Sequence, residues 1–352
     1  MKIKPFFLVS IICVFGMTSL LFSPFLFRLI EVRVGTPEVL LTAAERNALN
    51  LHTWPDGNIG IIKNDETYTF YGTNGGLLSK TSGTIGNPTN QVFYTNRTIQ
   101  GLKENYNYAG GGPVFKAGEY LFMFYHAEYH PNQNFQQFYS TIGIAYSSDE
   151  GETFYDLGKI IQTRYVLNED DPVAVEMTGA PFFIQDDYIF VFFRDTITTF
   201  QQNNLAVARC SITNLLLAIT QNETPNFSKY FQGSFTEPGL RGKSSALEFL
   251  NGNIRWFDVG FDSKKNQYVL VFVDDTIIGQ NLYLMFSQDL FHWGPRINLT
   301  FRSGEIFYPT LIGQEHNPKY SNGSWWIYYT YSALGSWSRW QDANLERLEI
   351  TL

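Results

Sequence analysis

The stretch GGPVFKAGEYLFMFYHAEY, from Gly111 to Tyr129, decides the fold of this chain. It predicts a short apolar strand from Pro113 to Phe115, a turn from Lys116 to Glu119, and an aromatic strand from Tyr120 to Tyr125. Because the aromatic strand has no polar face, protein must cover it on both sides. We therefore expect this strand to lie inside a stack of sheets.

The same pattern returns four more times, always as an apolar strand, a polar turn and a second strand rich in Tyr, Phe, Trp and Val. The other copies span Gly57 to Asn74, Thr178 to Thr196, Trp256 to Thr276, and Tyr308 to Ser332. The first aromatic residues of the five second strands (Tyr68, Tyr120, Tyr188, Tyr268 and Trp325) are 52, 68, 80 and 57 residues apart. These separations are long for a solenoid and suit the blades of an all-β, five-bladed β-propeller with unequal loops.

Third strands are expected after four of the copies, at Ser140 to Ser147, Leu205 to Cys210, Leu282 to Phe286, and Leu345 to Leu352. Since the chain ends with the last of these, we expect Leu29 to Val34 to supply an outer strand that closes the ring and removes an exposed sheet edge. Thr42 and Glu45 resemble a capping box that opens a short helix through Leu49. Gln221 to Ser245 is predicted to be a long polar connection without a blade strand.

Composition bounds the class of protein. The 352 residues are 17% aromatic and 16% charged and include 29 Gly, as in an all-β protein with many tight turns. The repeat reaches the C-terminus, so we expect one domain over residues 29–352. The net charge of −8 argues against nucleic acid or an anionic membrane surface as a partner. Cys210 is expected to be a small buried apolar residue.

Residues 1–28 are predicted to direct the chain out of the cytoplasm. Lys2 and Lys4 precede an uncharged apolar stretch of 23 residues, Pro5 to Phe27, which is long enough to span a bilayer. The small residues near its middle make a poor cleavage site, which favours an uncleaved signal-anchor helix; a cleaved signal peptide is the alternative. The propeller is thus expected outside the cytoplasm, either secreted or anchored, with membrane contact only through this segment.

Two turns and one strand carry a resemblance to a known family. Ser147 to Phe154 fits the SxDxGxT-aromatic hairpin called an Asp box, and Ser287 to Trp293 is a shortened version of it. With the YPTL sequence at Tyr308 to Leu311, the repeat resembles the five-bladed propeller glycoside hydrolases of the arabinanase and xylosidase group (family 43), with their invertase and levansucrase relatives. The resemblance covers roughly Asp56 to Leu352. It implies a sugar-cleaving enzyme with carbohydrate as its partner.

The resemblance also implies particular acids. In that family a general-base Asp opens the first blade, a second Asp comes from blade two, and a general-acid Glu opens blade three. Asp56 fits the first position. Gly110 to Gly112 stand where the second Asp is expected, and Gly179-Ala180-Pro181 stand in place of Glu-Gly-Pro, with Glu176 as the nearest acid.

The propeller geometry predicts a site independently of the resemblance. The first strand of each blade starts, and the second ends, on the same face of the ring, so these ends converge on one axis. Glycoside hydrolysis needs two carboxyl groups in different environments, and we prefer Asp56 with Glu176, keeping Asp258 as a reserve acid. Expected substrate-binding residues are Asn58, His126 (with Glu128 on the same strand end), Thr178, Arg194, Asp195, Trp256 and Tyr308. No cofactor is predicted, and a structural calcium ion in the channel is an open alternative.

Purely structural explanations of the same residues stay open. They are a turn for Asp56, a solvated loop for Glu176, a buried partner for Asp258, strand-end packing for His126, an ion pair for Arg194 with Asp195, and inter-blade packing for Trp256 and Tyr308. The alternative function is accordingly a non-catalytic propeller at the cell surface that binds a glycan or a protein.

Overall fold

The computed structural model describes residues 31–131, 139–166, 175–197, 202–247, 254–274, 281–300, 302–334 and 342–352. They belong to one compact unit, Glu31 to Leu352. The predicted signal segment, residues 1–28, lies outside the described residues, so the choice between an anchor and a cleaved peptide stays a prediction. Within the described ranges, no helix is long and apolar enough to cross a membrane.

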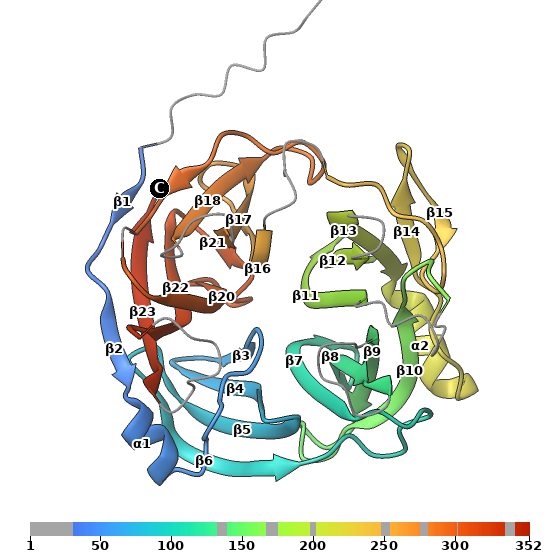
Figure 1. The fold of residues 1–352 in the computed structure, drawn as a ribbon, viewed down its shortest axis with the longest axis horizontal. Helices are drawn as coiled ribbons and strands as arrows, with labels where there is room; N and C mark the ends of the chain where they lie inside the picture. The colour runs from blue at the N-terminus through green and yellow to red at the C-terminus, as the bar shows by residue number, and fades with distance from the viewer. Residues whose placement is uncertain are drawn as a thin grey trace, which may run out of the picture. The chain divides into compact units, whose positions relative to one another are not determined.

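Five blades surround a central axis, as the sequence repeat predicts (Figure 1). Blade one contains β3 (Gly60–Asn64), β4 (Thr67–Asn74), β5 (Leu77–Thr84) and β6 (Asn87–Arg97), and blade two contains β7 (Tyr108–Ala117), β8 (Tyr120–Tyr129), β9 (Tyr139–Ser147) and β10 (Tyr155–Ile161). Blade three contains β11 (Val175–Gln185), β12 (Tyr188–Ile197), β13 (Gln202–Ser211), β14 (Ser228–Phe231) and β15 (Ser234–Pro238). Blade four contains β16 (Ile254–Asp262), β17 (Gln267–Asp274), β18 (Leu282–Ser287) and β19 (Ile297–Asn298). Blade five contains β20 (Glu305–Gly313), β22 (Ser324–Ser332) and β23 (Asn344–Thr351), and the short β21 (Tyr320–Ser321) pairs with β16 of blade four.

The aromatic second strands form the interior of the blades. In β8, which pairs with β7 on one side and β9 on the other, Phe122 and Phe124 are fully buried. The two phenylalanines pack with Phe115 of β7 at ring-centroid distances of 5.1 and 5.5 Å. The expectation that the aromatic strand lies inside a stack of sheets is confirmed.

The N-terminal strands close the ring. β1 (Arg33–Val34) and β2 (Glu38–Leu41) both pair with β23, which pairs with β22 on its other side. An ion pair between Arg347 and Glu38, 2.6 Å long, supports this closure. The predicted N-terminal closing strand is confirmed, although it consists of two short pieces and extends further along the chain than expected. The capping box is also present, because Thr42 and Glu45 bond each other's backbone amides at the start of α1 (Ala43–Ala48).

The prediction for Gln221 to Ser245 was wrong, because β14 and β15 lie within it and form the outer part of blade three. Only two residue pairs join β14 to β13, so an edge strand of this kind needs little apolar sequence. Its Lys229 is buried and donates to the carbonyls of Gln162 and Gly242, at 2.6 and 2.9 Å. The preceding helix α2 (Ile212–Gln221) was not predicted either.

Both Asp-containing turns are held by their own side chains. Asp149 accepts hydrogen bonds from the Ser147 hydroxyl at 2.7 Å and from the Thr153 amide at 2.9 Å. Asp289 accepts from the amides of Phe291 and His292, both at 2.9 Å. These contacts agree with a structural role for the two turns.

Candidate functional site

A pocket of about 500 Å³ lies where the first strands of the blades begin, and residues from all five blades line it. We call it the central pocket. Six of the ten residues predicted for the site line it: Asp56, Asn58, His126, Thr178, Trp256 and Tyr308. The convergence of strand ends that are far apart in the sequence therefore produces a real concave site.

Interruptions of the strands shape the pocket wall. The register of β7, β11, β16 and β20 against the neighbouring second strand shifts at residues 112–113, 180–181, 255–256 and 308–309. A bulge of this kind redirects side chains and is common beside functional sites. Three of the four contain a proline (Pro113, Pro181 and Pro309), which cannot donate a ladder hydrogen bond and is tolerated in a sheet at such points.

Asp56 is the central acid of the pocket. Its Oδ2 accepts a hydrogen bond from the Tyr108 hydroxyl at 2.9 Å, and its Oδ1 accepts one from the Tyr308 hydroxyl at 3.2 Å. The carboxyl is partly exposed to the pocket, yet protein surrounds it closely. Burial raises the pKa of Asp56 above its usual range, although the two tyrosine hydroxyls oppose that shift. Asp56 can therefore hold a proton at a higher pH than an ordinary aspartate.

The position of Tyr308 is conformationally special. Its backbone φ is +49°, in the left-handed region that non-glycine residues avoid, and it occupies the bulge in β20. Strain of this kind costs about 1–3 kcal/mol and concentrates at functional sites. Here the bulge directs the hydroxyl of Tyr308 onto Asp56.

Glu128 is held between two histidines. His126 Nε2 lies 2.9 Å from Glu128 Oε1, and His130 Nε2 lies 2.7 Å from Oε2. The other ring nitrogen of His126 lies 3.1 Å from the Met177 carbonyl, which can only accept a hydrogen bond, so Nδ1 carries a proton. Burial opposes ionisation of Glu128, but the hydrogen bonds and charges of the two histidines outweigh it and lower the pKa of the carboxyl. The pocket thus contains two carboxyl groups whose pKa values shift in opposite directions.

Trp256 presents little of its ring to the pocket. Only 8% of the residue is exposed, and its ring lies 4.9 Å from that of Phe307 and 5.2 Å from that of Tyr308. The Arg255 guanidinium lies 4.4 Å from the Trp256 ring centroid. Trp256 accordingly packs between blades four and five and contributes an edge to the wall of the pocket.

Asn58 forms the inner end of the pocket. Its Nδ2 donates to the carbonyls of Phe257 and Pro309, both at 2.9 Å, and so connects blade one to blades four and five. Among the described residues, the buried hydroxyl of Thr178 has no hydrogen-bond partner. It lines the central pocket and can accept a polar group of a ligand.

Glycines occupy the place of the expected second Asp because blades one and two approach closely there. A Cβ at Gly112 would lie 2.6 Å from the carbonyl oxygen of Asn58, and one at Gly110 would lie 2.6 Å from Thr73 Cγ2. A carboxylate side chain therefore has no room at these positions. Asp56 instead receives its contacts from Tyr108, two residues before this run.

The structure does not bring the other predicted residues into the central pocket. Asp258 is fully buried in the wall of the channel, where its carboxylate contacts Lys319 Nζ at 2.6 Å and the Leu311 amide at 2.8 Å. Asp195 accepts a hydrogen bond from the Ser244 hydroxyl at 2.5 Å, and Arg194 contacts the Arg255 carbonyl at 3.5 Å. These three residues have structural contacts, as their alternative explanations hold.

Glu176 stays a prediction. Its backbone pairs with Thr196 in β11, but its side chain lies outside the described part of the structure. The pairing of Asp56 with Glu176 is therefore neither supported nor contradicted. As for a metal, no group of three or more His, Cys, Asp or Glu among the described residues is arranged to hold one.

Sequence reasoning missed Tyr108 and His130 and assigned Glu128 no role of its own. A signal for two of them was present. His126, Glu128 and His130 alternate in the sequence, and residues two apart in a strand point to the same face. Tyr108 has no comparable signal, because only the packing of blade two against blade one places its hydroxyl beside Asp56.

Solved structures of glycoside hydrolases have the same fold. A family 117 glycoside hydrolase from the marine bacterium Zobellia galactanivorans aligns with a TM-score of 0.54 at 8% identity, covering 84% of this chain and 86% of that one. An exo-β-1,3-galactanase of Phanerochaete chrysosporium, solved with β-1,3-galactotriose, aligns with a TM-score of 0.52 at 10% identity, covering 90% of this chain and 64% of that one. An α-L-arabinofuranosidase of Podospora anserina, solved with cellotriose, aligns with a TM-score of 0.50 at 10% identity, covering 84% of this chain and 90% of that one.

This chain has the five-bladed propeller fold of these glycoside hydrolases. At such low identity the likeness concerns the fold alone. No protein-family model matches the sequence, and no curated protein matches it either. Which reaction the propeller carries out has to be argued from its own residues.

Proposed function

We propose that this protein is an exported glycoside hydrolase and that the central pocket is its active site. The observation that carries the proposal is the pair of carboxyl groups in one pocket, Asp56 with a raised pKa and Glu128 with a lowered one. Acid-catalysed cleavage of a glycosidic bond uses one carboxyl that holds its proton and another that stays ionised.

Asp56 is the proposed general acid. It protonates the oxygen of the leaving group, and the two tyrosine hydroxyls then stabilise the carboxylate that forms. Glu128 supplies the ionised carboxylate, whose charge stabilises the cationic character that develops at the sugar carbon in the transition state. Glu176 stays a second candidate for the ionised group.

The ligand class follows from what lines the pocket. The Thr178 hydroxyl and the carboxyl groups offer hydrogen bonds to sugar hydroxyls, and the edge of Trp256 offers apolar contact. Two of the structures with this fold contain sugars, cellotriose in one and β-1,3-galactotriose in the other. They support carbohydrate as the partner of this chain without specifying which sugar.

The test is an activity screen of the purified full-length chain against aryl glycosides and polysaccharides. On any substrate that is cleaved, Asp56→Asn should lower kcat by about 10²- to 10⁴-fold with little change in KM, because it removes the proton donor. Glu128→Gln and Glu176→Gln decide between the two candidates for the ionised group. Glu119→Gln, at an exposed hairpin turn, is the control and should keep full activity. Full activity of Asp56→Asn, or no cleavage of any substrate, would contradict the proposal.

A non-catalytic sugar-binding propeller is the second candidate. The observation that favours it is that both oxygens of Glu128 already accept hydrogen bonds from histidines, which leaves this carboxylate few free lone pairs. Binding on a glycan array by a wild-type chain that cleaves nothing would establish this function instead.

Export is proposed from the N-terminal sequence alone. N-terminal sequencing of the protein recovered from its native membrane or medium tests it. A start at residue 1 or 2 in the membrane fraction indicates an anchor, and a start near residue 28 in the medium indicates cleavage.

A further inference from the structure

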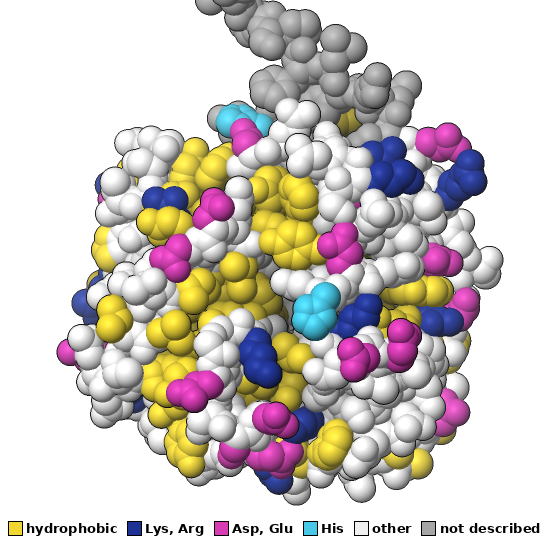
Figure 2. All heavy atoms as spheres, turned by 180° about the vertical axis from the view of Figure 1, so that it is seen from behind, with side chains coloured by type: hydrophobic (Ala, Val, Ile, Leu, Met, Phe, Trp, Pro, Cys, Tyr) yellow, Lys and Arg dark blue, Asp and Glu magenta, His cyan; other side chains and the backbone are white. Residues whose placement is uncertain are grey.

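A second cavity, of about 320 Å³, lies at the other end of the propeller channel. Its lining comes from the far ends of the first strands and from the hairpin turns of blades one, two, three and five. In blade one the central pocket ends at Asn58 and this cavity begins at Ile59, so the two are separate sites. Figure 2 shows the molecule from the side opposite to Figure 1, with hydrophobic side chains gathered near the middle beside a histidine and basic side chains.

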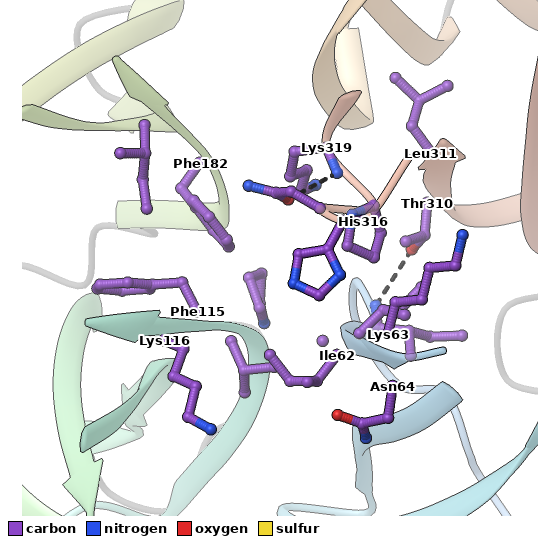
Figure 3. Close-up of a pocket in the computed structure, with 18 residues that line it drawn as sticks. Ile62, Lys63, Asn64, Phe115, Lys116, Phe182, Thr310, Leu311, His316 and Lys319 are labelled. Carbon is purple, nitrogen blue, oxygen red and sulfur yellow. Dashed lines mark hydrogen bonds between the residues drawn. The ribbon is translucent and has the colours of Figure 1, made fainter. Parts of the chain in front are cut away.

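The walls of the second cavity are apolar and partly aromatic. Phe115 and Phe182 are both buried and lie 5.2 Å apart between ring centroids. Ile62, Ile184 and Leu311 complete the apolar lining. In Figure 3 the two phenylalanines lie on one side of the His316 ring and Lys63 lies on the other. A flat apolar group between these walls would be covered on several sides.

The rim is basic. Lys63, Lys116, Lys319 and His316 line the cavity, and none of its described lining residues is acidic. We call it the lysine-rimmed pocket. A concentration of one charge sign around a cleft attracts ligands of the opposite sign. The sign here is notable because the whole chain has a net charge of −8.

The lysines differ in how much of their bonding capacity is used. Lys319 is neutralised by the buried Asp258, and 12% of its side chain is exposed. Lys63 donates one hydrogen bond, 2.7 Å long, to the Gln314 carbonyl, and an ammonium group has three donors. Lys116 is exposed at the end of β7. Lys63 and Lys116 can therefore both donate to a ligand.

We propose that the lysine-rimmed pocket is a second ligand site and that it binds a small aromatic carboxylate. The ring would lie between Phe115, Phe182 and Ile62, and the carboxylate would accept hydrogen bonds from Lys63 and Lys116. The size of the cavity falls within the range of small-molecule sites, about 300–1,000 Å³. A neutral sugar would leave the basic rim unused, and an inorganic anion would leave the apolar walls uncovered. The inference does not depend on glycosidase activity.

Isothermal titration calorimetry of the full-length chain with naphthalene-2-carboxylate tests the site. The neutral naphthalene-2-carboxamide should bind at least about tenfold more weakly, because it lacks the charge that the rim selects. Raising the salt concentration should weaken the binding of the carboxylate and leave that of the amide unchanged. Inorganic sulfate should not displace the probe at equal concentration.

Variants locate the site. Lys63→Gln and Lys116→Gln should each weaken binding by about threefold or more, whereas Lys243→Gln, an exposed lysine of the loop after β15, should leave it unchanged. Ile62→Asp places a negative charge in the wall and should abolish binding; a melting temperature close to that of the wild type shows that it folds. Asp56→Asn should bind the probe normally.

Several results would overturn the proposal. They are equal affinity for the carboxylate and the amide, equal competition by sulfate, or unchanged binding by Ile62→Asp. Loss of binding in Asp56→Asn would place the probe in the central pocket and would also overturn it.

Discussion

Replacing Lys319 by Met should uncover the cost of burying the carboxylate of Asp258. Asp258 is 0% exposed in β16, and its Oδ1 contacts Lys319 Nζ at 2.6 Å. Methionine keeps most of the apolar stem of lysine and removes the charge. The carboxylate then keeps only the amides of Leu311 and Val259, both at 2.8 Å.

The magnitude follows from the loss of a buried partner. Breaking a buried ion pair from one side costs about 3–5 kcal/mol, because an uncompensated charge stays in the interior. Since two backbone amides still bond the carboxylate of Asp258, we expect the lower end, a loss of about 3 kcal/mol in the free energy of unfolding at pH 7.

The loss should depend on pH. Burial raises the pKa of Asp258, and the charge of Lys319 is the largest effect opposing this shift. Without Lys319 the pKa in the folded state rises further, so between the unfolded and folded pKa values the native state holds the extra proton. The stability of the variant therefore falls as the pH rises through this window, and its deficit should be smaller at pH 5 than at pH 7.

Urea unfolding followed by tryptophan fluorescence at both pH values measures this. Lys116→Met, which removes an exposed lysine near the same cavity, is the control and should change stability by less than about 0.5 kcal/mol. Asp258→Asn combined with Lys319→Met should recover part of the loss. A loss below about 1 kcal/mol at pH 7, or an equal loss at both pH values, would refute the reasoning.

Three further predictions concern other parts of the chain. Tyr108→Phe removes a hydrogen bond to the carboxylate of Asp56, worth about 1.5 kcal/mol, so it should move the alkaline limb of the pH–rate profile up by about one unit; an unmoved limb would argue against Asp56 as the acid. Gly143→Ala should lower the free energy of unfolding in urea by about 1–3 kcal/mol, because its Cβ would overlap the buried Tyr125 ring; unchanged stability would contradict this close packing. Burial lowers the pKa of Lys229 to about 8, so the unfolded chain binds this proton more tightly, and the stability of the wild type relative to Lys229→Met should rise by about 2 kcal/mol from pH 8 to pH 10 in urea titrations. A flat difference would mean that the folded protein tolerates the charge.

Periodicity explains why much of the fold could be predicted. An aromatic strand such as Tyr120 to Tyr125 must be covered on both faces wherever it occurs, and five such strands predict five blades. A capping box uses only neighbouring residues, so Thr42 and Glu45 could be recognised without any tertiary contact. Edge strands are harder, because β14 is short, polar and paired at only two positions, and its residues resemble a loop.

The chemistry of the site was only partly predictable. Asp56 and Asp258 each stand near the start of a first strand, and the sequence by itself determined that both would lie close to the channel. Only the tertiary structure decided that Asp56 faces an open pocket between two tyrosines whereas Asp258 faces Lys319 in the wall. The physical reason is that a carboxylate's pKa and partners depend on neighbours from other blades, and a one-dimensional pattern does not contain those distances.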